Sequence, residues 1–330
     1  MRSAGLIVMA SAAAALPPLP TIPPLPVHLA SAGLTVQAQT AVDRQPGNPA
    51  FGFGTVWVPS SATGVVDRVD PKSLKVTVRI PSAVAHTTAQ NEYYDSVAVS
   101  ANAVWHASDL GNEVDRIDPK TNRVRARIFV PGRPDAIAAG PNGVYVSLFH
   151  QNVVLRLDPA SNAIKGRRDV GGNVMGVAYG AGAVWALSVT GPQVVKLSPS
   201  SLAVLGKTSI ASTAAPPGAG YFDAWWIGAG ADSVCALNQQ QNLVTRIDPR
   251  TGKVAAQTPL GFGSNPFSIA ADGTRCWAVN AAGVFETTAE GKVASSHLPR
   301  VGPSAFVGVT TGAGAAWVTA AGRNTLFRVR

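Results

Sequence analysis

The sequence predicts an all-β fold, a seven-bladed β-propeller of four-stranded blades, and three observations predict it. A valine-plus-aromatic step recurs seven times, with anchor residues Trp57, Trp105, Tyr145, Trp185, Cys235, Trp277 and Trp317. The anchors lie 40 to 50 residues apart, a period typical of propeller blades. Each copy consists of short runs with two-residue alternation between turn residues, and no useful helix-period segment follows residue 33.

Each copy contains four predicted strands, and the third copy shows them most clearly. They cover residues 135–140, 143–147, 152–157 and 163–170, in order from the ring axis to the rim. The first of them is rich in small residues, which suits an innermost strand because blades taper toward the axis.

The third strand of several copies ends in a repeated motif: arginine, an apolar residue, aspartate and proline. The motif occurs at 68–71, 116–119, 156–159 and 246–249. Proline directly after aspartate begins a tight turn and cannot continue a strand ladder. We interpret these aspartates as turn residues and not as metal ligands.

The two ends of the chain are predicted to pair with each other. The sequence stops at Arg330, where the third strand of the seventh copy would finish. Residues 34–42 alternate like a strand but belong to no copy, so we expect them to pair antiparallel with 324–329 as the missing outer strand. This pairing would remove two open sheet edges and make residues 33–330 a single propeller domain.

Residues 1–32 are predicted to be a secretory signal peptide. They contain Arg2, an apolar alanine-rich run at 6–16, and Ala30-Ser31-Ala32 as a cleavage motif. The alternative is a disordered leader. We expect a secreted or periplasmic protein, and no membrane span, because no run of 18 apolar residues exists.

The chain is basic, with a formal net charge of +9. Fourteen of the 27 Lys and Arg residues lie between Arg68 and Arg168, mostly in third and fourth strands. Two interpretations follow: protection of exposed strand edges by charge, or attraction of an anionic polymer or lipid headgroup. We expect no nucleic-acid partner, because no basic face is interleaved with aromatic residues.

Known catalytic motifs are absent from the sequence. It contains no Gly-rich phosphate loop, G-x-G-x-x-G, H-E-x-x-H or G-x-S-x-G. The five histidines are scattered, and His106 is interpreted as a strand residue. Only His86 and His150 fall in loops where they could reach a ligand, so these two are the candidate catalytic residues.

Two copies are lengthened, at residues 81–95 and 211–223. Both insertions connect a fourth strand to the first strand of the next copy. Connections from a fourth strand to the next first strand lie on the same face of the ring as connections from a second to a third strand. We call this face the top face. The insertions end alike, in Tyr93-Tyr94-Asp95 and Tyr221-Phe222-Asp223, and should face each other across the channel mouth. Long loops on a rigid scaffold often carry function.

The predicted ligand-binding residues at this mouth combine aromatic planes with charges, which suits a sugar ring or an organic cation. They are Glu92, Tyr93, Tyr94, Asp95, Arg133, Asp135, Tyr221, Phe222, Asp223 and Trp225. The alternative is that the aromatic residues plug the channel. No organic cofactor is predicted; Glu92, Asp95 and Asp135 could instead hold a divalent cation, Mg²⁺ or Ca²⁺.

The two cysteines leave two alternatives open. Cys235 is an anchor, whereas Cys276 precedes the anchor Trp277, so they occupy opposite faces of equivalent strands in neighbouring copies. One orientation aims them at each other and the other aims both away. Export favours a bridge, but packed sheets about 10 Å apart exceed the roughly 7 Å that a disulfide spans. We predict only that both side chains are buried.

The repeats resemble those of a known group of propellers. Gly-Ala-Val-Trp at 182–185 and the segments 112–124 and 242–254 are similar to the YVTN-type and streptogramin lyase-like seven-bladed propellers. The resemblance implies the same fold. For the lyases of the group it also implies a histidine with a nearby glutamate and magnesium, and this sequence contains no Glu-x-His element.

The predicted function is binding: a monomeric platform whose top-face channel mouth holds a small molecule, a carbohydrate or a protein. The alternative is a metal-assisted lyase or hydrolase at the same mouth. In that case His86 or His150 would act as the general base, because a histidine titrates near neutral pH.

Overall fold

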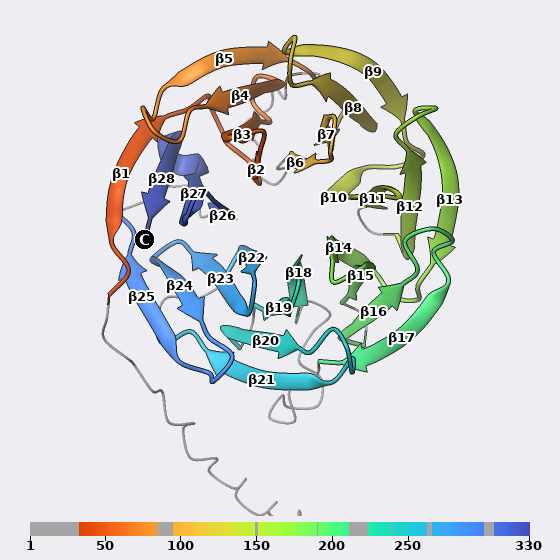
Figure 1. The fold of residues 1–330 in the computed structure, drawn as a ribbon, viewed down its shortest axis with the longest axis vertical. Helices are drawn as coiled ribbons and strands as arrows, with labels where there is room; N and C mark the ends of the chain where they lie inside the picture. The colour runs from red at the N-terminus through yellow and green to blue at the C-terminus, as the bar shows by residue number, and fades with distance from the viewer. Residues whose placement is uncertain are drawn as a thin grey trace, which may run out of the picture.

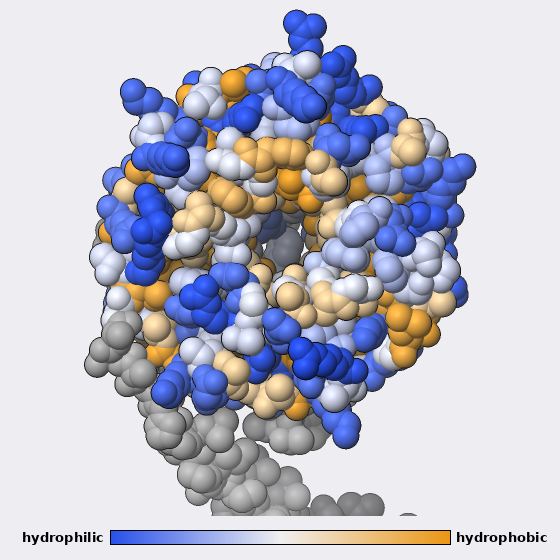
Figure 2. Space-filling view, in the orientation of Figure 1, coloured by the Kyte–Doolittle hydropathy of each residue, from blue (hydrophilic) through white to orange (hydrophobic). Residues whose placement is uncertain are grey.

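The computed structural model describes residues 33–83, 85, 95–148, 151–189, 191–210, 224–239, 241–262, 266–299 and 307–330. Twenty-eight strands in this part of the chain form seven four-stranded antiparallel sheets, arranged as blades of a ring (Figure 1). The ring surrounds a central opening, and hydrophilic residues lie around its outer rim (Figure 2). The predicted seven-bladed β-propeller is confirmed.

The strands of each blade follow one another from the axis to the rim. Blade 1 contains β2 (Ala50–Gly52), β3 (Thr55–Ser60), β4 (Val65–Val69) and β5 (Val76–Pro81), and blade 2 contains β6 (Ser96–Val99), β7 (Val104–Ser108), β8 (Glu113–Asp118) and β9 (Arg123–Phe129). Blade 3 contains β10 (Pro134–Gly140), β11 (Gly143–Leu148), β12 (Val153–Asp158) and β13 (Ala163–Asp169), and blade 4 contains β14 (Val174–Gly180), β15 (Ala183–Ser188), β16 (Gln193–Leu197) and β17 (Val204–Ser209).

The remaining blades have the same order. Blade 5 contains β18 (Ala224–Ala229), β19 (Val234–Asn238), β20 (Leu243–Ile247) and β21 (Val254–Pro259), and blade 6 contains β22 (Ser268–Asp272), β23 (Arg275–Asn280), β24 (Gly283–Thr287) and β25 (Val293–His297). Blade 7 contains β26 (Val307–Gly312), β27 (Ala315–Ala320), β28 (Thr325–Val329) and β1 (Val36–Ala41), with a 3₁₀ turn at Ala321–Arg323.

The N-terminal strand closes the ring as predicted. Strand β1 pairs antiparallel with β28, with Ala41 opposite Thr325 and Val36 opposite Val329. Strand β1 is therefore the outer strand of blade 7 and lies beside the C-terminal end of the chain (Figure 1).

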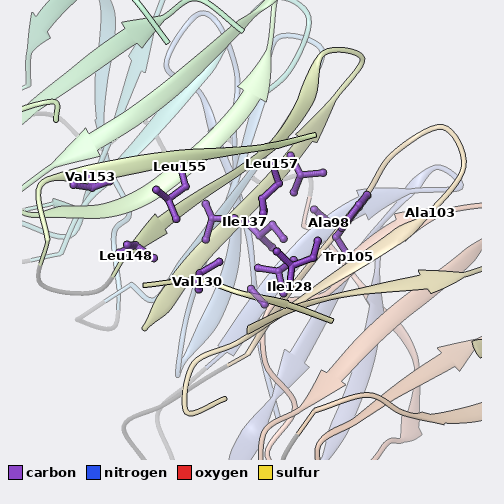
Figure 3. Packing of buried hydrophobic residues seen from close by; sticks show 14 residues of the cluster. Ala98, Ala103, Trp105, Ile128, Val130, Ile137, Leu148, Val153, Leu155 and Leu157 are labelled. Atoms are coloured by element: carbon purple, nitrogen blue, oxygen red, sulfur yellow. The ribbon is translucent and has the colours of Figure 1, made fainter. Parts of the chain in front are cut away.

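The hydrophobic core lies between the blades. The cluster between blades 2 and 3 joins Trp105 and Ile128 of one blade to Ile137, Leu148 and Leu155 of the next (Figure 3). All are buried, and truncating such a large buried side chain to alanine typically costs about 3–5 kcal/mol. The ring is thus held by face-to-face packing of consecutive blades.

A cationic residue on the third strand adds a polar contact to this packing. Arg68 pairs across the sheet with the anchor Trp57, and its guanidinium lies 5.1 Å from the ring centroid. Arg68 Nη1 also donates to the Pro119 carbonyl of blade 2, at 2.9 Å. The same two contacts are made by Arg116 with Trp105 and Pro159, and by Lys196 with Trp185 and Pro249.

The Asp-Pro motifs form turns, as predicted. Asp70 Oδ1 accepts the backbone N–H groups of Lys72 and Ser73, both at 2.8 Å. At the equivalent turn of blade 2, hydrogen bonds from the Lys120 backbone and from Arg125 lower the pKa of Asp118 to about 2. These carboxylates are engaged by their own turns.

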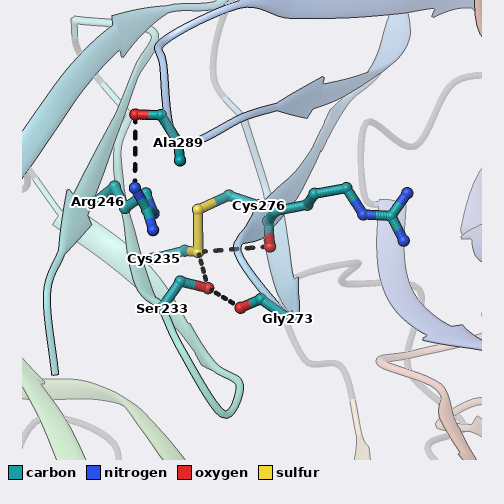
Figure 4. Close-up of a disulfide and its surroundings, with 7 residues drawn as sticks. Ser233, Cys235, Arg246, Gly273, Cys276 and Ala289 are labelled. Atoms are coloured by element: carbon teal, nitrogen blue, oxygen red, sulfur yellow. Dashed lines mark hydrogen bonds between the residues drawn. A yellow bond between two sulfur atoms is a disulfide. The ribbon is translucent and has the colours of Figure 1, made fainter.

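The two cysteines form a disulfide between blades 5 and 6 (Figure 4). Both are fully buried, as predicted, and their Cα atoms are 5.9 Å apart. The spacing is shorter than that of two flat packed sheets because the blades converge toward the axis. A Cβ added at Gly228 of β18 would lie only 3.0 Å from the Ala270 backbone of the next blade.

We predict that removal of the closing strand destabilises the whole ring. Deleting residues 1–42 leaves the edge of β28 unpaired, so the melting temperature should fall by about 10 °C or more and soluble protein should aggregate. Deleting residues 1–32 alone should change neither property. Circular dichroism melting and gel filtration would check this; a monodisperse 1–42 deletion with an unchanged melting temperature would contradict it.

We predict a measurable contribution from the disulfide. A bridge over a sequence separation of 41 residues is worth up to about 4 kcal/mol through the unfolded chain. Unfolded, unreduced protein should contain no free thiol, reduction should expose two, and Cys235→Ala/Cys276→Ala should melt at a lower temperature. Two free thiols before reduction would refute the bridge.

Candidate functional site

The structure describes some of the predicted site residues and not others. Outside the described residues lie His86, Glu92, Tyr93, Tyr94, His150, Tyr221, Phe222 and Asp223. Trp225 belongs to β18, but its side chain is likewise outside the described part. Asp95, Arg133 and Asp135 are described in full, and the site is therefore built from these three.

Asp95, Asp135 and Trp225 occupy the same position in three different blades. In each of these blades, the residue directly after the anchor pairs with a residue of the inner strand. The predicted site residue lies two positions before that inner-strand residue. These pairs are Val97 with His106, Ile137 with Val146, and Ile227 with Ala236. The three predicted residues therefore start their inner strands at one level of the ring.

Asp95 ends a buried chain of polar side chains. Its Oδ2 lies 3.0 Å from His106 Nε2, and its Oδ1 accepts the Asp109 backbone N–H. His106 Nδ1 lies 2.9 Å from Ser82 Oγ, which donates to Asp115 Oδ2 at 3.1 Å. None of Ser82, Asp95, His106 and Asp115 is more than 1% exposed. We call these four residues the Asp–His–Ser–Asp chain.

The chain requires one proton more than its neutral groups provide. Three side-chain contacts link the four residues, so three hydrogens are needed. A neutral imidazole and a serine hydroxyl supply two, because ionised carboxylates only accept. A protonated carboxyl can supply the third. Burial, with the nearby charge of Glu113, raises the pKa of Asp115 to about 6, which fits a shared proton.

The repeat shows that two members of this chain, Ser82 and His106, depart from the other copies. His106 follows the anchor, a position that is Val or Ala in the six other copies. The Ser82 backbone N–H donates to the carbonyl of Gly64, the residue before the third strand of blade 1. The equivalent donors in the other blades are all apolar: Val42, Val130, Val170, Ile210, Leu260 and Leu298. A column-by-column alignment of the copies would have revealed both. His106 is a strand residue, as predicted, but its role was missed.

The chain joins the two ends of the first insertion. Ser82 directly follows β5, and Asp95 directly precedes β6. His106 on β7 contacts both of them, so one buried side chain fixes where the insertion leaves blade 1 and where it enters blade 2.

Arg133 and Asp135 lie beside this anchor in blade 3. Arg133 makes a bidentate contact with Asp109, with both N–O distances at 2.7 Å. Among the described residues, the buried Oδ2 of Asp135 has no hydrogen-bond partner. Desolvation by burial, together with the charge of Asp109, raises the pKa of Asp135 to about 8. Burial therefore favours the neutral form of the Asp135 carboxyl, which can donate a hydrogen bond.

A cavity of about 110 Å³ is bordered by inner-strand residues that include Ser96, Trp226 and Ser268. The Asn48 amide crosses it, donating to Ser96 Oγ at 3.3 Å and accepting from Ser268 Oγ at 3.0 Å. Blades 1, 2 and 6 are thereby linked across the axis.

The described residues do not fit the magnesium site that the lyase resemblance implies. No three His, Cys, Asp or Glu side chains in the described part of the chain are grouped to hold a metal ion. Both nitrogens of His106 already have partners, and His297 stacks on Phe262 with ring centroids 4.0 Å apart. The metal set Glu92, Asp95 and Asp135 stays a prediction, since Glu92 lies outside the described residues.

The comparisons with known proteins concern the fold. No protein-family model matches the sequence, and no curated protein matches it. A streptogramin B lyase structure has 15% identity and a TM-score of 0.71, covering 89% of this chain and 97% of that one. Virginiamycin B lyase from Staphylococcus aureus has 14% identity and a TM-score of 0.70, covering 90% and 98%. Kuenenia stuttgartiensis hydrazine synthase has 14% identity and a TM-score of 0.66, covering 88% and 97%. The resemblance to streptogramin lyase-like propellers is thus confirmed at the level of the fold.

We predict that Asp115 gives the protein a distinct pH dependence. Its folded pKa of about 6 exceeds the ordinary value of 3.8, so the folded protein keeps a proton that the unfolded chain loses. Stability should therefore fall by roughly 1–3 kcal/mol as the pH rises from about 4 to about 6. Asp115→Asn, which cannot ionise, should show less of this fall in urea denaturation.

Asp118→Asn is the matched control for this measurement. The pKa of Asp118 is lowered, so its contribution is lost only below pH 4. Its variant should keep the wild-type slope between pH 4 and pH 7. Identical slopes for Asp115→Asn and wild type would contradict the role assigned to Asp115.

Proposed function

We propose that this protein is a binding platform that holds a small molecule, a carbohydrate or a protein at the top-face mouth of its channel. One observation carries the proposal: the Asp–His–Ser–Asp chain fastens both ends of the first insertion to the rigid ring. That insertion carries Glu92, Tyr93 and Tyr94 of the predicted site.

The Asp–His–Ser–Asp chain takes the place of apolar packing at two positions. Apolar residues fill the positions of Ser82 and His106 in the other copies, and such packing is often at least as stable as a buried polar network. A polar chain in this core therefore fixes the positions of the segments that it joins more than it stabilises the fold. A loop with fixed ends loses less conformational freedom on binding, which raises affinity.

The proposed contacts divide into planes and polar anchors. Tyr93, Tyr94, Tyr221 and Trp225 are the planes, while Glu92, Asp135 and Asp223 are the anchors. Asp95 is buried in the Asp–His–Ser–Asp chain and holds the end of the insertion. A neutral Asp135 carboxyl both donates and accepts hydrogen bonds, as a sugar hydroxyl requires. Arg133, held by Asp109, places a fixed positive charge beside it. This combination favours a polar, ring-shaped ligand.

A second candidate function is a metal-assisted lyase or hydrolase at the same mouth, favoured by the fold shared with the streptogramin B lyase structure. His86 or His150 would have to be its general base, because His106 is buried with both ring nitrogens engaged. Metal analysis of the purified protein separates the two candidates: bound stoichiometric Mg²⁺ or Ca²⁺ would favour the enzyme.

We also propose that the protein is exported, with residues 1–32 as the signal peptide. The buried Cys235–Cys276 bridge supports this, because disulfides persist in oxidising compartments. Within the described residues, no helix is long and apolar enough to cross a membrane.

We predict that the top-face aromatic residues are needed for binding. A glycan array and a panel of quaternary ammonium compounds would first identify a ligand. Tyr94→Ala and Trp225→Ala should each then weaken its binding at least about tenfold, since stacking contact is lost. Phe129→Ala, which removes an outer-strand aromatic that is 71% exposed, should bind like wild type. Equal affinities for all four proteins would refute the site.

A further inference from the structure

We propose a second binding site on the face opposite the channel mouth, which takes a linear acidic polysaccharide. The site is a cavity of about 920 Å³ between blades 1 and 2. It is formed by two kinds of turn: those between the first and second strands of a blade, and those between the third and fourth strands. Both kinds of turn lie on the face opposite the top face. The residues that define it are Phe53, Arg68, Arg116, Asp118, Lys120 and Arg125.

Phe53 is the feature that marks the cavity as a site. It occupies the first position of the turn between β2 and β3. The six equivalent residues are all small: Ala101, Pro141, Ala181, Ala231, Gly273 and Ala313. Phe53 is 41% exposed and adopts a left-handed conformation, with φ of 53°. This conformation costs a non-glycine residue roughly 1–2 kcal/mol, and a bulky residue rarely adopts it.

An exposed aromatic in a strained turn contributes neither to the core nor to the turn. Glycine or alanine would form the same turn with less strain or with less exposed apolar surface. The left-handed conformation belongs to the turn itself, because Ala181 and Ala313 adopt it at the same position with φ of 48° and 51°. What sets Phe53 apart is its bulky, exposed ring. The ring of Phe53 therefore has a use outside folding, and its place in the cavity indicates contact with a ligand.

The cavity is strongly cationic, and most of its charges are held in place. Arg68 and Arg116 lie over Trp57 and Trp105 and donate to carbonyls of the next blade. Arg125 donates to Asp118 at 3.1 and 3.3 Å, so the only carboxylate of the lining is already paired. Lys120 is exposed. With Arg125 paired to Asp118, the three cations Arg68, Arg116 and Lys120 leave the lining positively charged, and fixed cations lose little freedom on binding an anion.

The cavity continues along the ring, which indicates a chain and not a single sugar. A second cavity of about 670 Å³ shares Ala101, Asn102 and Arg116 with the first. It extends past Asn142 to Tyr179 of blade 4. Together the two cavities, which we call the groove, are lined by residues of blades 1 to 4, with room for more than one linked unit. The second cavity also contains the carboxylate of Asp158, which accepts hydrogen bonds from the Ala160 backbone and the Ser161 hydroxyl of its own turn.

The chemistry of the groove selects among polyanions. An aromatic face packs against the C–H face of a sugar ring, and arginine or lysine pairs with a carboxylate or sulfate on it. Single-stranded nucleic acid is bound by successive aromatic platforms, one for each base. The first cavity offers one exposed aromatic among four cations, so one sugar ring with its acidic group fits it better.

The test measures binding of polygalacturonate and heparin to the full chain, with neutral dextran and poly(dT) as comparison probes. We expect both acidic polysaccharides to bind and dextran to fail. Phe53→Gly keeps the left-handed turn and should leave the melting temperature equal or higher, while weakening polysaccharide binding about tenfold. Lys120→Ala should weaken it too, with a smaller salt dependence.

Lys207→Ala is the matched control, because it removes the same charge from an exposed position on β17. It should bind polygalacturonate like wild type. Equal losses for Lys120→Ala and Lys207→Ala, or unchanged binding by Phe53→Gly, would overturn the proposal in favour of diffuse charge attraction. Tighter binding of poly(dT) than of both polysaccharides would overturn it in favour of nucleic acid. Top-face variants such as Tyr94→Ala should leave this binding unchanged, so the two proposed sites fail independently.

Discussion

Consecutive blades are tied together by a contact that begins at the anchor tryptophan. A cationic residue on the neighbouring strand lies over the indole ring and donates a hydrogen bond to the carbonyl of the next Asp-Pro turn. The contact repeats where the anchor is Trp57, Trp105 or Trp185, and it fixes the height of each blade against the next. Blade 3 replaces it with the Tyr145 hydroxyl, which donates to the Pro199 carbonyl at 2.7 Å. Blade 5 has Cys235 at the anchor position, and a covalent bond to blade 6 takes the place of the aromatic ring.

This contact explains what could be predicted from the sequence. The anchor, the third-strand cation and the Asp-Pro turn recur in several copies, and blades 1, 2 and 4 use them to make the same contact. This recurrence revealed the architecture and the closing strand. The sequence could not decide whether Cys235 and Cys276 form a disulfide. The two-residue alternation of strands left two orientations for the side chains, and the distance between the cysteines depends on how closely the small inner-strand residues let the blades approach. The top-face residues could be named from the insertions, since length alone distinguishes those connections.

The Asp–His–Ser–Asp chain escaped prediction for a physical reason. Ser82, His106 and Asp115 are ordinary residues in three separate segments, and only the packing of blade 1 on blade 2 brings them together. Each one alone would leave a buried polar group unsatisfied, which costs about 1–3 kcal/mol. Together they give one another hydrogen-bond partners. The other six blades have apolar residues at the positions of Ser82 and His106, whereas Asp67 of blade 1 and Asp135 of blade 3 keep a carboxyl at the positions of Asp115 and Asp95.

The interface between blades 1 and 2 is where the two proposed sites meet. Its top end holds the polar chain that fixes the first insertion, and its opposite end holds Phe53 with the cations of the groove. Arg68 and Arg116 are part of both the ring contacts and the groove lining, so the groove cannot change shape without moving the blades. The two ends of this interface therefore differ in what they offer: a buried polar chain at the top end, and an exposed aromatic ring beside fixed cations at the opposite end.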